Sequence, residues 1–484
     1  MRTIDSAENW PGFSELLCEV KGTVPKWSQS VSKVVVKTLK GQYYDLGLEL
    51  PVGFERLENP NVNTVTTGHQ LQLFGGPAFL HYKTITAIRK AKELSNSDHP
   101  VVPVFWMASE DHDFEEIRWV YGKSEKHSWQ FDSNLQMVGR LGLDGLQDAF
   151  NGWVSDGLSD MSDLQSVLSD SIKNGESYAQ FFTRFMHLFY SDTGLVVIDA
   201  SHENLKCLFA SEMQSELEQE GIALEVLEGP VKPREINLFY SAENGSRIGV
   251  IPSSDGPISN GEYVSSETPQ NLSPSVLLRP LYQEKILPNS HVILGPSEIK
   301  YWQQLTPAFK KRGINFPTLF LRDHVLVIED EDFSLLKTLG WSLQKGWWSD
   351  DDFVRVLMDE EMVRGFGIRL EDLNDDDTLI GVLEKMKIEF GQELADEDAP
   401  FRIKAKIRKT AIKKVKRHLK NHLKSEISNV IKANGKLMKG MIPQDRWGNF
   451  HVLSESVGGF KSLRDKLLET TDVKGPVIQV IAAS

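Results

Sequence analysis

The stretch 101–113 constrains the fold of this chain more than any other part of the sequence. Residues 101–107 form an uninterrupted apolar run, which is followed by Ser109, Glu110, Asp111, His112 and Asp113. A continuous apolar run of this length is typical of a strand covered on both faces, as in a parallel sheet. Because open parallel sheets bind ligands just beyond the carboxyl ends of their strands, the polar residues stand where a site is expected.

A second stretch with the same organisation lies earlier in the chain. Residues 63–68 form a short β-rich run that leads into a turn containing Gly68, Gly75 and Gly76. A helix pattern follows at 77–94, with a proline at its first position and apolar residues at three- and four-residue spacing. Together with the strand at 101–107, these segments predict a strand–helix–strand unit.

Apolar strands that end in polar residues recur further along the chain. They are expected at 194–199, 291–295 and 316–322. Strands that alternate with helices predict an α/β fold with a doubly wound, mostly parallel sheet. We expect residues 1–375 to form this core, with inserted connecting segments near 123–190 and 230–275.

The last third of the chain changes character. Residues 350–398 contain 17 acidic and 5 basic residues, whereas 401–440 contain 14 basic residues and one acid. A helix pattern at 378–394 has Asp377 as its expected N-cap, and a second pattern carries an apolar stripe. The stripe consists of Ile412, Val415, Leu419, Leu423, Ile427 and Val430.

These patterns predict a helical hairpin or coiled-coil arm over 376–440. We favour a solvated helix face with pairing inside the chain over nucleic-acid binding as the explanation of the charges. The apolar stripe needs a partner, and a second subunit would supply one, so we expect a homodimer through the arm. Residues 441–484 are expected to return to the core, with 477–481 as a possible strand.

Charge and cysteine content narrow the function classes. The formal net charge of −14 argues against binding to nucleic-acid backbones. The two cysteines, Cys18 and Cys207, can form neither a disulfide framework nor a paired-cysteine metal site. No secretory signal and no membrane-spanning run is visible, so we expect a cytoplasmic protein that does not bind membranes.

The polar residues after the strand at 101–107 have two explanations. Glu110, Asp111, His112 and Asp113 could hold a cation, orient an amine or act as a general base. Alternatively, they cap a helix, with Ser109 or Asp111 as the N-cap. We favour a functional role because four such residues exceed what a cap requires. A zinc site is disfavoured, since no second His or Cys lies at ligand spacing.

The remaining candidates are also open to two interpretations. The Gly68–Gly75–Gly76 turn could let backbone N–H groups approach a phosphate, or it could simply be a tight turn that needs glycine. Lys83 and Arg279 could bind anions, or could form surface salt bridges. Tyr301 and Trp302 could wall a sugar or adenine site, although buried core aromatics are commoner.

Four blocks of residues resemble a known family, the bacillithiol biosynthesis cysteine-adding enzymes. They are 67–77 with Tyr82 and Lys83, 103–116, 273–288 with Arg279 and Glu284, and 295–302 with Glu298, Tyr301 and Trp302. The resemblance extends over the whole chain and implies a Rossmann-like core, connecting insertions and a dimerising coiled coil. One departure is His69, where the family often carries Gln, which favours a hydrogen-bonding role for His69 over an acid–base role.

The resemblance implies a ligase that joins L-cysteine to glucosaminyl-malate through an amide bond, in the last step of bacillithiol biosynthesis. ATP is the expected co-substrate, although the chain shows neither a His-x-Gly-His signature nor a clear Lys-Met-Ser-Lys-Ser loop. The expected catalytic residues are Glu110, Asp111, His112 and Asp113. The expected substrate- or nucleotide-binding residues are Gly68, His69, Gln70, Gly75, Gly76, Lys83, Arg279, Glu284, Glu298, Tyr301 and Trp302.

In the mechanism expected from this resemblance, Asp111, His112 or Asp113 accepts a proton from the attacking amine or grips the cysteine ammonium. The Gly68–Gly76 turn and Lys83 would receive phosphate or the malate carboxylates, and Arg279 is the other candidate for malate. No metal site is expected. Two rival functions remain: a nucleotide-dependent ligase or nucleotidyltransferase for another small substrate, and a dimeric binding scaffold without enzymatic activity.

Overall fold

The computed structural model describes residues 2–6, 21–133, 136–159, 161–218, 221–242, 245–265, 268–340, 349–441, 449–469 and 477–483. Cys18 lies outside the described residues, and Cys207 is an exposed free thiol. None of the helices in these ranges is both long enough and apolar enough to cross a membrane.

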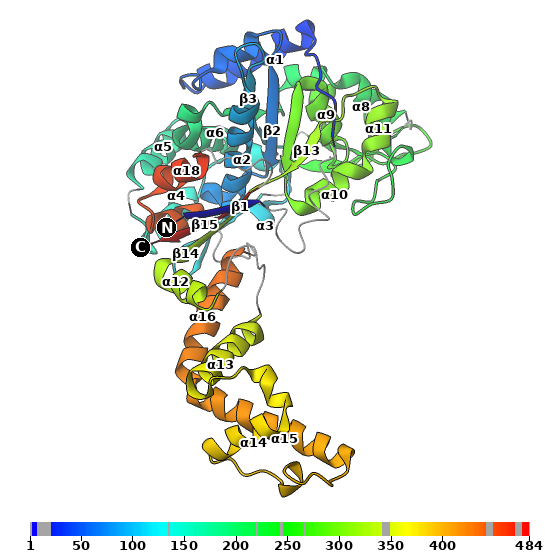
Figure 1. Ribbon diagram of the computed structural model, residues 1–484. Coiled ribbons are helices and arrows are strands. Elements are labelled where there is room, and N and C mark those ends of the chain that lie inside the picture. Colours follow the sequence, from blue (N-terminus) through cyan, green and yellow to red (C-terminus); the bar gives the residue numbers. More distant parts are fainter. Residues whose placement is uncertain are drawn as a thin grey trace.

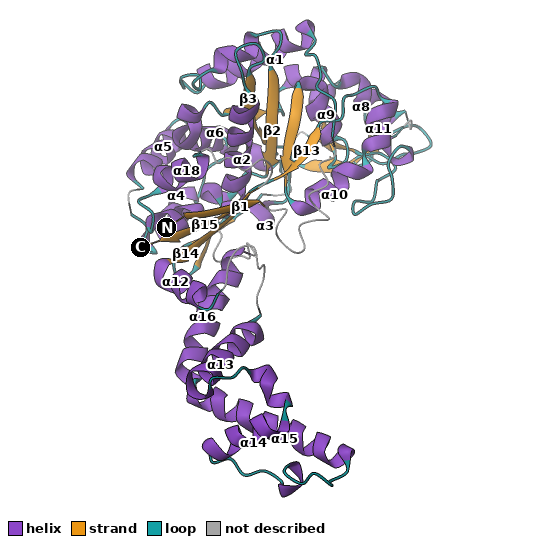
Figure 2. Ribbon diagram, viewed as in Figure 1, coloured by secondary structure: helices purple, strands orange, loops and turns teal. Residues whose placement is uncertain are grey.

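The core of the molecule is a five-stranded parallel sheet (Figures 1 and 2). Its order is β13-β12-β2-β3-β6, and every neighbouring pair is parallel. The strands are β2 (Asn63–His69), β3 (Val101–Met107), β6 (Val196–Asp199), β12 (Asn289–Leu294) and β13 (Thr318–Leu321). All five correspond to strands predicted from the sequence, so the doubly wound α/β fold is confirmed.

The sheet is covered on both faces, which explains its apolar strands. Every residue of β3 is buried. Val104 and Trp106 belong to the apolar cluster shared with α1 (Gln29–Tyr44), whereas Phe105 and Met107 belong to the cluster shared with α2 (Ala78–Leu94). Alternate side chains of one strand thus enter two separate cores, as expected where helices pack on both faces of a sheet.

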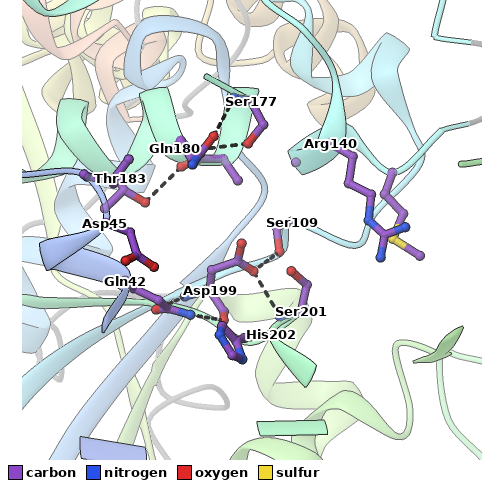
Figure 3. Close-up of a pocket in the computed structure, with 14 residues that line it drawn as sticks. Gln42, Asp45, Ser109, Arg140, Ser177, Gln180, Thr183, Asp199, Ser201 and His202 are labelled. Carbon is purple, nitrogen blue, oxygen red and sulfur yellow. Dashed lines mark hydrogen bonds between the residues drawn. The ribbon is translucent and has the colours of Figure 1, made fainter. Parts of the chain in front are cut away.

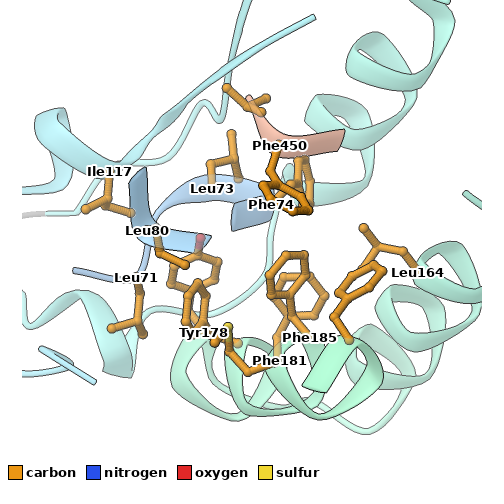
Figure 4. Close-up of a cluster of buried hydrophobic side chains, with 14 of the residues drawn as sticks. Leu71, Leu73, Phe74, Leu80, Ile117, Leu164, Tyr178, Phe181, Phe185 and Phe450 are labelled. Atoms are coloured by element: carbon orange, nitrogen blue, oxygen red, sulfur yellow. The ribbon is translucent and has the colours of Figure 1, made fainter. Parts of the chain in front are cut away.

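The first predicted insertion forms a helical layer on the α2 side of the sheet. It contains the hairpin β4 (Trp119–Tyr121) and β5 (Lys126–Ser128), and the helices α4 (Leu146–Ser155), α5 (Ser162–Lys173) and α6 (Tyr178–Tyr190). Figure 4 shows Phe181 and Phe185 of α6 near Phe74 of the turn after β2. Phe74 also stacks on Trp153 of α4, with ring centroids 5.2 Å apart. The insertion therefore shares one core with the sheet.

The second predicted insertion forms small antiparallel sheets beside the other apolar cluster. The strands β7 (Leu238–Ser241), β8 (Arg247–Gly249) and β11 (Leu272–Pro274) make a three-stranded sheet, and β9 (Ile258–Ser259) and β10 (Glu262–Tyr263) make a hairpin. The helices α7 (Glu203–Cys207) and α8 (Ala210–Leu217) precede this region, and α9 (Arg279–Ile286), α10 (Pro296–Gln304) and α11 (Thr306–Lys311) follow it.

The two ends of the chain meet in a further sheet (Figure 1). In it, β15 (Val477–Ala483) lies between β14 (His324–Glu329), to which it is parallel, and β1 (Arg2–Ser6), to which it is antiparallel. Helices α17 (Phe450–Glu455) and α18 (Phe460–Leu468) add Phe450 and Phe460 to the core on the α2 side. Both helices thus place described residues from the end of the chain in this core.

A helical arm extends away from the core (Figure 1). After α12 (Asp330–Thr338), it contains α13 (Asp350–Phe366), α14 (Asp376–Lys385), α15 (Phe401–His422) and α16 (Lys424–Met441). The predicted start at residue 376 is too late, because Val354 and Met358 of α13 share the arm's apolar cluster with Val415. The charge change at residue 350, and not the later helix pattern, marks where the arm begins.

Two local predictions about the arm are also wrong. The N-cap of α14 is Asp375 and not Asp377, since the Asp375 carboxylate accepts a hydrogen bond from the N–H of Thr378 at 2.9 Å. The helix predicted at 378–394 ends at Lys385, and Lys387 has a positive φ of 56°. This left-handed residue breaks the helix although the apolar spacing continues beyond it.

Candidate functional site

A cavity of about 440 Å³ opens at the carboxyl ends of β2 and β12. The chain runs from β2 to β3 and β6 on one side, and then returns to place β12 and β13 on the other side of β2. The cavity therefore lies at the point where the strand order reverses, the usual ligand position in an open α/β sheet. We call it the crevice.

Residues from all four blocks singled out in the sequence reach the crevice. The predicted residues that line it are Gly68, His69, Gln70, Asp111, Arg279, Glu298, Tyr301 and Trp302. They come from the end of β2 and the turn after it, from the loop after β3, from the start of α9 and from α10. Glu116 and Gln283 line it too, although sequence reasoning missed both. The only signal for Glu116 was its place in the acidic run that follows Asp111.

Asp111 is the charged centre of the crevice. Its carboxylate oxygens lie 3.8 Å from Nη1 of Arg279 and 4.0 Å from Nη1 of Arg247. Burial by itself would raise the pKa of Asp111, but the two guanidinium groups and a hydrogen bond from the N–H of His112 hold it below the usual value. Asp111 is therefore ionised at neutral pH, and the two arginines leave an excess of positive charge around it.

His112 lies beside this charge cluster and does not line the crevice. Its Nδ1 is 3.1 Å from Nη1 of Arg247, and because a guanidinium only donates hydrogen bonds, Nδ1 is the acceptor. Burial and Arg247 both lower the pKa of His112, so the imidazole is neutral. Arg247 was not predicted, since a single arginine within a loop-rich segment carries no sequence signal.

Arg247 is a fixed part of the site and not a mobile surface group. Its guanidinium donates to the Ser273 hydroxyl at 2.8 Å and to the carbonyl of Pro274 at 3.0 Å, and it lies 3.7 Å from the ring centroid of Phe239. Burial and the neighbouring Arg279 lower its pKa to about 9, which still leaves it charged at pH 7. The guanidinium of Arg234 lies 4.8 Å from the centroid of the same Phe239 ring.

Lys83 acts on the crevice through Glu298. Its buried ammonium donates to the carbonyl of Gly68 at 2.5 Å and to Glu298 at 2.9 Å. Burial would raise the pKa of Glu298, but Lys83 and the N–H of Gly295 lower it. Lys83 is thus occupied by protein groups, and its place favours positioning of Glu298 over the expected role in receiving phosphate.

His69 is neutral in this setting. Burial and the nearby Lys83 lower the pKa of His69 to about 4. Gln70, beside it, donates to Glu116 at 2.6 Å and to Asp111 at 3.4 Å. A neutral imidazole next to an amide network suits hydrogen bonding to a ligand, in line with the role expected for His69.

Glu110 and Asp113, like His112, do not line the crevice. Glu110 is buried and forms an ion pair with Lys206, whose ammonium also donates to the carbonyl of Leu272. Asp113 caps the short helix α3 (Phe114–Ile117) by accepting from the N–H of Glu116 at 3.3 Å. A helix cap does occur in this segment, but the cap is Asp113 and not Ser109 or Asp111, which were the expected candidates.

Gly75 and Gly76 form a tight turn inside the core. Both have positive φ, and a Cβ on Gly75 would stand 2.4 Å from Nε2 of His81. Neither glycine lines the crevice, so the structure favours the tight-turn alternative over approach to a phosphate. Gly68, by contrast, does line it.

Glu284 was expected to bind substrate but lies beneath the crevice. It is buried and accepts hydrogen bonds from the amides of Gln283 at 2.9 Å and Asn289 at 2.8 Å. Burial raises the pKa of Glu284 to about 8. Because Asn289 also accepts from Thr64 and Thr66 of β2, this network fixes β12 against β2.

A second cavity, of about 400 Å³, lies at the same edge of the sheet, beside β6 (Figure 3). We call it the β6 cavity. It is lined by residues of α1, of the loops after β3 and β6, and of α6, among them Gln42, Asp45, Ser109, Gln180, Asp199 and His202. The loop at 108–111 separates the two cavities, since Ser109 faces the β6 cavity and Asp111 faces the crevice.

Within the part of the chain that the structure describes, no three His, Cys, Asp or Glu side chains gather in a way that could hold a metal ion. The ionisable groups of the crevice are instead satisfied by arginine, lysine and amide partners. The crevice is therefore a polar site whose wall carries the carboxylates of Asp111, Glu116 and Glu298 and the guanidinium of Arg279, with Arg247 behind Asp111.

Residues 18–323 match the family model described as "Bacillithiol biosynthesis BshC, N-terminal Rossmann-like domain". The chain belongs to the BshC family. The match covers the sheet and both cavities, so the residues described above lie inside the shared domain of the family.

Relatives named "Putative cysteine ligase BshC" extend this match. The protein of Cytophaga hutchinsonii is 32% identical over 70% of this chain and 68% of its own length, and that of Flavobacterium johnsoniae is 34% identical over 67% and 65%. The alignment thus spans slightly less than two thirds of the Flavobacterium protein. The BshC of Christiangramia forsetii is 28% identical over 96% of this chain and 91% of its own.

Proposed function

We propose that this protein is a ligase that joins L-cysteine to glucosaminyl-malate through an amide bond and consumes ATP. The observation that carries the proposal is the crevice at the sheet's switch point, where an ionised Asp111 lies between two guanidinium groups. Membership of a family whose relatives are named as cysteine ligases supports a ligase that acts on small molecules.

The arginine cluster is suited to the anionic groups of the substrates. Arg279 begins α9 and is half-buried, and its guanidinium makes no hydrogen bond to any described residue. It therefore has donors to offer to a carboxylate or a phosphate, for which a guanidinium is geometrically matched. Arg247 and Arg234 add positive charge behind it.

ATP fits this charge distribution better than it fits the glycine turn. Its phosphates would lie towards Arg279, while Tyr301 and Trp302 of α10 offer the aromatic part of the wall. In the proposed reaction, the cysteine carboxylate displaces pyrophosphate from ATP and forms an acyl-adenylate. The sugar amine then attacks the carbonyl carbon, so that the C–N bond forms, the bond to AMP breaks and one proton is released.

The acidic groups of the crevice are suited to hold the ammonium group of cysteine. Asp111 has a depressed pKa, so it is a weak proton acceptor but a good partner for an ammonium group. Gln70 links Asp111 to Glu116, and the two carboxylates thus face the same side of the crevice. The chain has only two cysteines, so few protein thiols compete with the thiol of the substrate.

The test is to incubate the purified protein with ATP, L-cysteine and glucosaminyl-malate, and to follow the products by mass spectrometry. We expect bacillithiol and AMP in equal amounts, and no product when any one substrate is left out. The variant Asp111→Asn should retain the fold and lose most of the activity, whereas Asp113→Asn should retain activity because Asp113 only caps α3. If the unaltered protein forms no thiol product, the whole proposal fails. If it forms the product together with ADP instead of AMP, the adenylate step is wrong.

A further inference from the structure

The β6 cavity has the size and position of a second small-molecule site. Its volume of about 400 Å³ falls within the range of roughly 300–1,000 Å³ that is usual for ligand sites. It lies beyond the carboxyl ends of β3 and β6, at the same edge of the sheet as the crevice. Neither the ion pairs of the crevice nor the sequence motifs account for it.

Asp199 is the fixed carboxylate of this cavity (Figure 3). Its Oδ1 accepts hydrogen bonds from the Ser109 hydroxyl at 2.5 Å and from the N–H of Ser201 at 3.0 Å. The side-chain amide of Gln42 donates a hydrogen bond to the backbone carbonyl of Asp199 at 2.7 Å. Oδ2 accepts no hydrogen bond from any described residue, so one carboxylate oxygen is both fixed in place and available to a ligand.

The other polar groups of the wall are donors and acceptors at defined positions. Nδ1 of His202 accepts from the N–H of Asn204 at 3.2 Å, so a neutral imidazole carries its proton on Nε2. The side-chain carbonyl of Gln180 accepts from the N–H of Ser177 at 2.8 Å, which leaves the amide NH₂ of Gln180 to a ligand. The hydroxyl of Ser201 lies beside Asp199.

The charges of the wall favour an ammonium group beside Asp199 and leave any carboxylate of the ligand to Arg140. Asp45 and Asp199 line the cavity against a single guanidinium, that of Arg140, which donates to the Ser241 hydroxyl at 3.0 Å. A phosphate or a carboxylate at Asp199 would meet a carboxylate of the same sign. Hydroxyl groups and an ammonium group are the partners that such a wall can satisfy.

One loop contributes residues to the walls of both cavities. Ala108 and Asp111 line the crevice, and Ser109 lines the β6 cavity. A ligation needs its nucleophile and its activated acyl group side by side, because positioning the two reactants supplies much of the rate. The crevice and the β6 cavity adjoin at residues 108–111, so the two reactants could bind next to each other, one in each cavity.

We propose that the β6 cavity binds a polyhydroxylated amine of the amino-sugar class, with Asp199 as the group that receives its ammonium. The assignment of this ligand as the acceptor substrate rests on the proposed function. Asp199 anchors the sugar amine, His202 and Gln180 take hydroxyl groups, and the crevice is left to the cysteine and the nucleotide.

The experiment measures equilibrium binding to the full chain by titration calorimetry, with glucosaminyl-malate, its N-acetylated form, D-glucosamine, ATP and L-cysteine as probes. In Asp199→Asn the amide oxygen can keep the bonds from Ser109 and Ser201 while the charge is lost. Loss of a charged hydrogen bond costs roughly 1.5–3 kcal/mol, so the affinity for glucosaminyl-malate should fall about ten- to a hundredfold. The affinities for ATP and cysteine should stay unchanged.

Two controls make the result specific. Asp163→Asn alters an exposed carboxylate of α5 and should leave all affinities unchanged. N-acetylated substrate lacks the ammonium, so it should bind the unaltered protein weakly and Asp199→Asn equally weakly. Gln180→Ala, which alters a different part of the wall, should also weaken sugar binding.

The outcomes separate this inference from the proposed function. If the protein makes the thiol product but Asp199→Asn binds the sugar substrate as tightly as the unaltered protein does, the inference is overturned and the function stands. Suppose that D-glucosamine binds to the unaltered protein, that Asp199→Asn weakens this binding, and that no thiol product forms. The inference then stands and the proposed function fails. Loss of ATP affinity in Asp199→Asn would show that the β6 cavity takes the nucleotide instead, and would overturn the inference.

Discussion

At the scale of single residues, neighbours along the chain have different roles. Glu110 pairs with Lys206 in the interior, Asp111 faces the crevice, His112 accepts from Arg247, and Asp113 caps α3. The sequence predicted a polar cluster at the end of β3 but could not divide it. The partners that decide each role, Lys206 and Arg247, are distant in the sequence and are brought near only by the fold.

Arg279 provides a test of the crevice at this scale. Arg279→Ala should lower kcat/KM of the proposed ligation about ten- to a hundredfold, because a hydrogen bond to a charged group is worth roughly 1.5–3 kcal/mol. The midpoint of urea unfolding should hardly change, since the guanidinium is 3.8 Å from its ionic partner. Arg279→Lys should recover only part of the activity, because an ammonium cannot form the two-pronged contact of a guanidinium. Full activity in Arg279→Ala would contradict its role.

Glu284 gives a pH-dependent prediction. Burial raises the pKa of Glu284 to about 8, from 4.5 for a free side chain. The folded state therefore binds a proton that the unfolded state has lost between these pH values, so the stability contributed at Glu284 is present below about pH 4.5 and declines as the pH rises to about 8. The decline is at most about 1.4 kcal/mol per pH unit.

Glu284→Gln should remove this dependence, because the amide oxygen can accept the same hydrogen bonds from Gln283 and Asn289 without ionising. Urea unfolding of both proteins at about pH 5 and about pH 8 would give the comparison. The variant should match the unaltered protein at the lower pH and exceed it at the higher. An equal difference at both pH values would mean that Glu284 does not titrate in this range.

At the scale of elements, the strands were predictable and the ends of the helices were not. Four of the five core strands contain apolar runs, as is typical of strands covered on both faces, whereas β2 was predicted from its β-rich composition of Thr and Val. The end of α14 was missed because an apolar spacing continues past the left-handed residue Lys387. The place of the crevice followed from strand ends alone, whereas the β6 cavity depends on how α1 and α6 pack beside β6.

The turn between β2 and α2 tests a local element. Gly75→Ala should lower the free energy of unfolding by about 1–3 kcal/mol, because φ is 80° and the new Cβ would meet the ring of His81. Gly41→Ala is the matched control: this glycine lies within α1 with nothing near its Cβ, so the change should stabilise by roughly 0.5–1 kcal/mol. Chemical denaturation of the two variants measures both. Equal stabilities would show that the turn does not need its glycine.

At the scale of the whole molecule, the arm buries most of its apolar stripe against its own helices and pairs some of its charges within the chain. Val415, Leu419 and Leu423 of the predicted stripe are buried against α13 and α14, within one chain. The acidic and basic segments also meet, for example where Arg408 pairs with Asp376 at 2.6 Å. The stripe therefore does not itself require a second subunit, and a dimer through the arm would need other apolar residues.

Such residues lie at the start of α15. Phe401 is 79% exposed and Ile403 46% exposed, which is unusual for side chains of this kind.

If the predicted homodimer forms through the arm, the double variant Phe401→Ser with Ile403→Ser should shift the protein from dimer to monomer in sedimentation velocity, without a change in the unfolding of the core. Val52→Ser alters an apolar residue of the core that is 64% exposed, and it should leave the dimer intact. A dimer that persists in the double variant would place the interface elsewhere, and a monomeric unaltered protein would remove the homodimer altogether. Ligase activity measured on the same samples would then show whether the activity depends on the dimer.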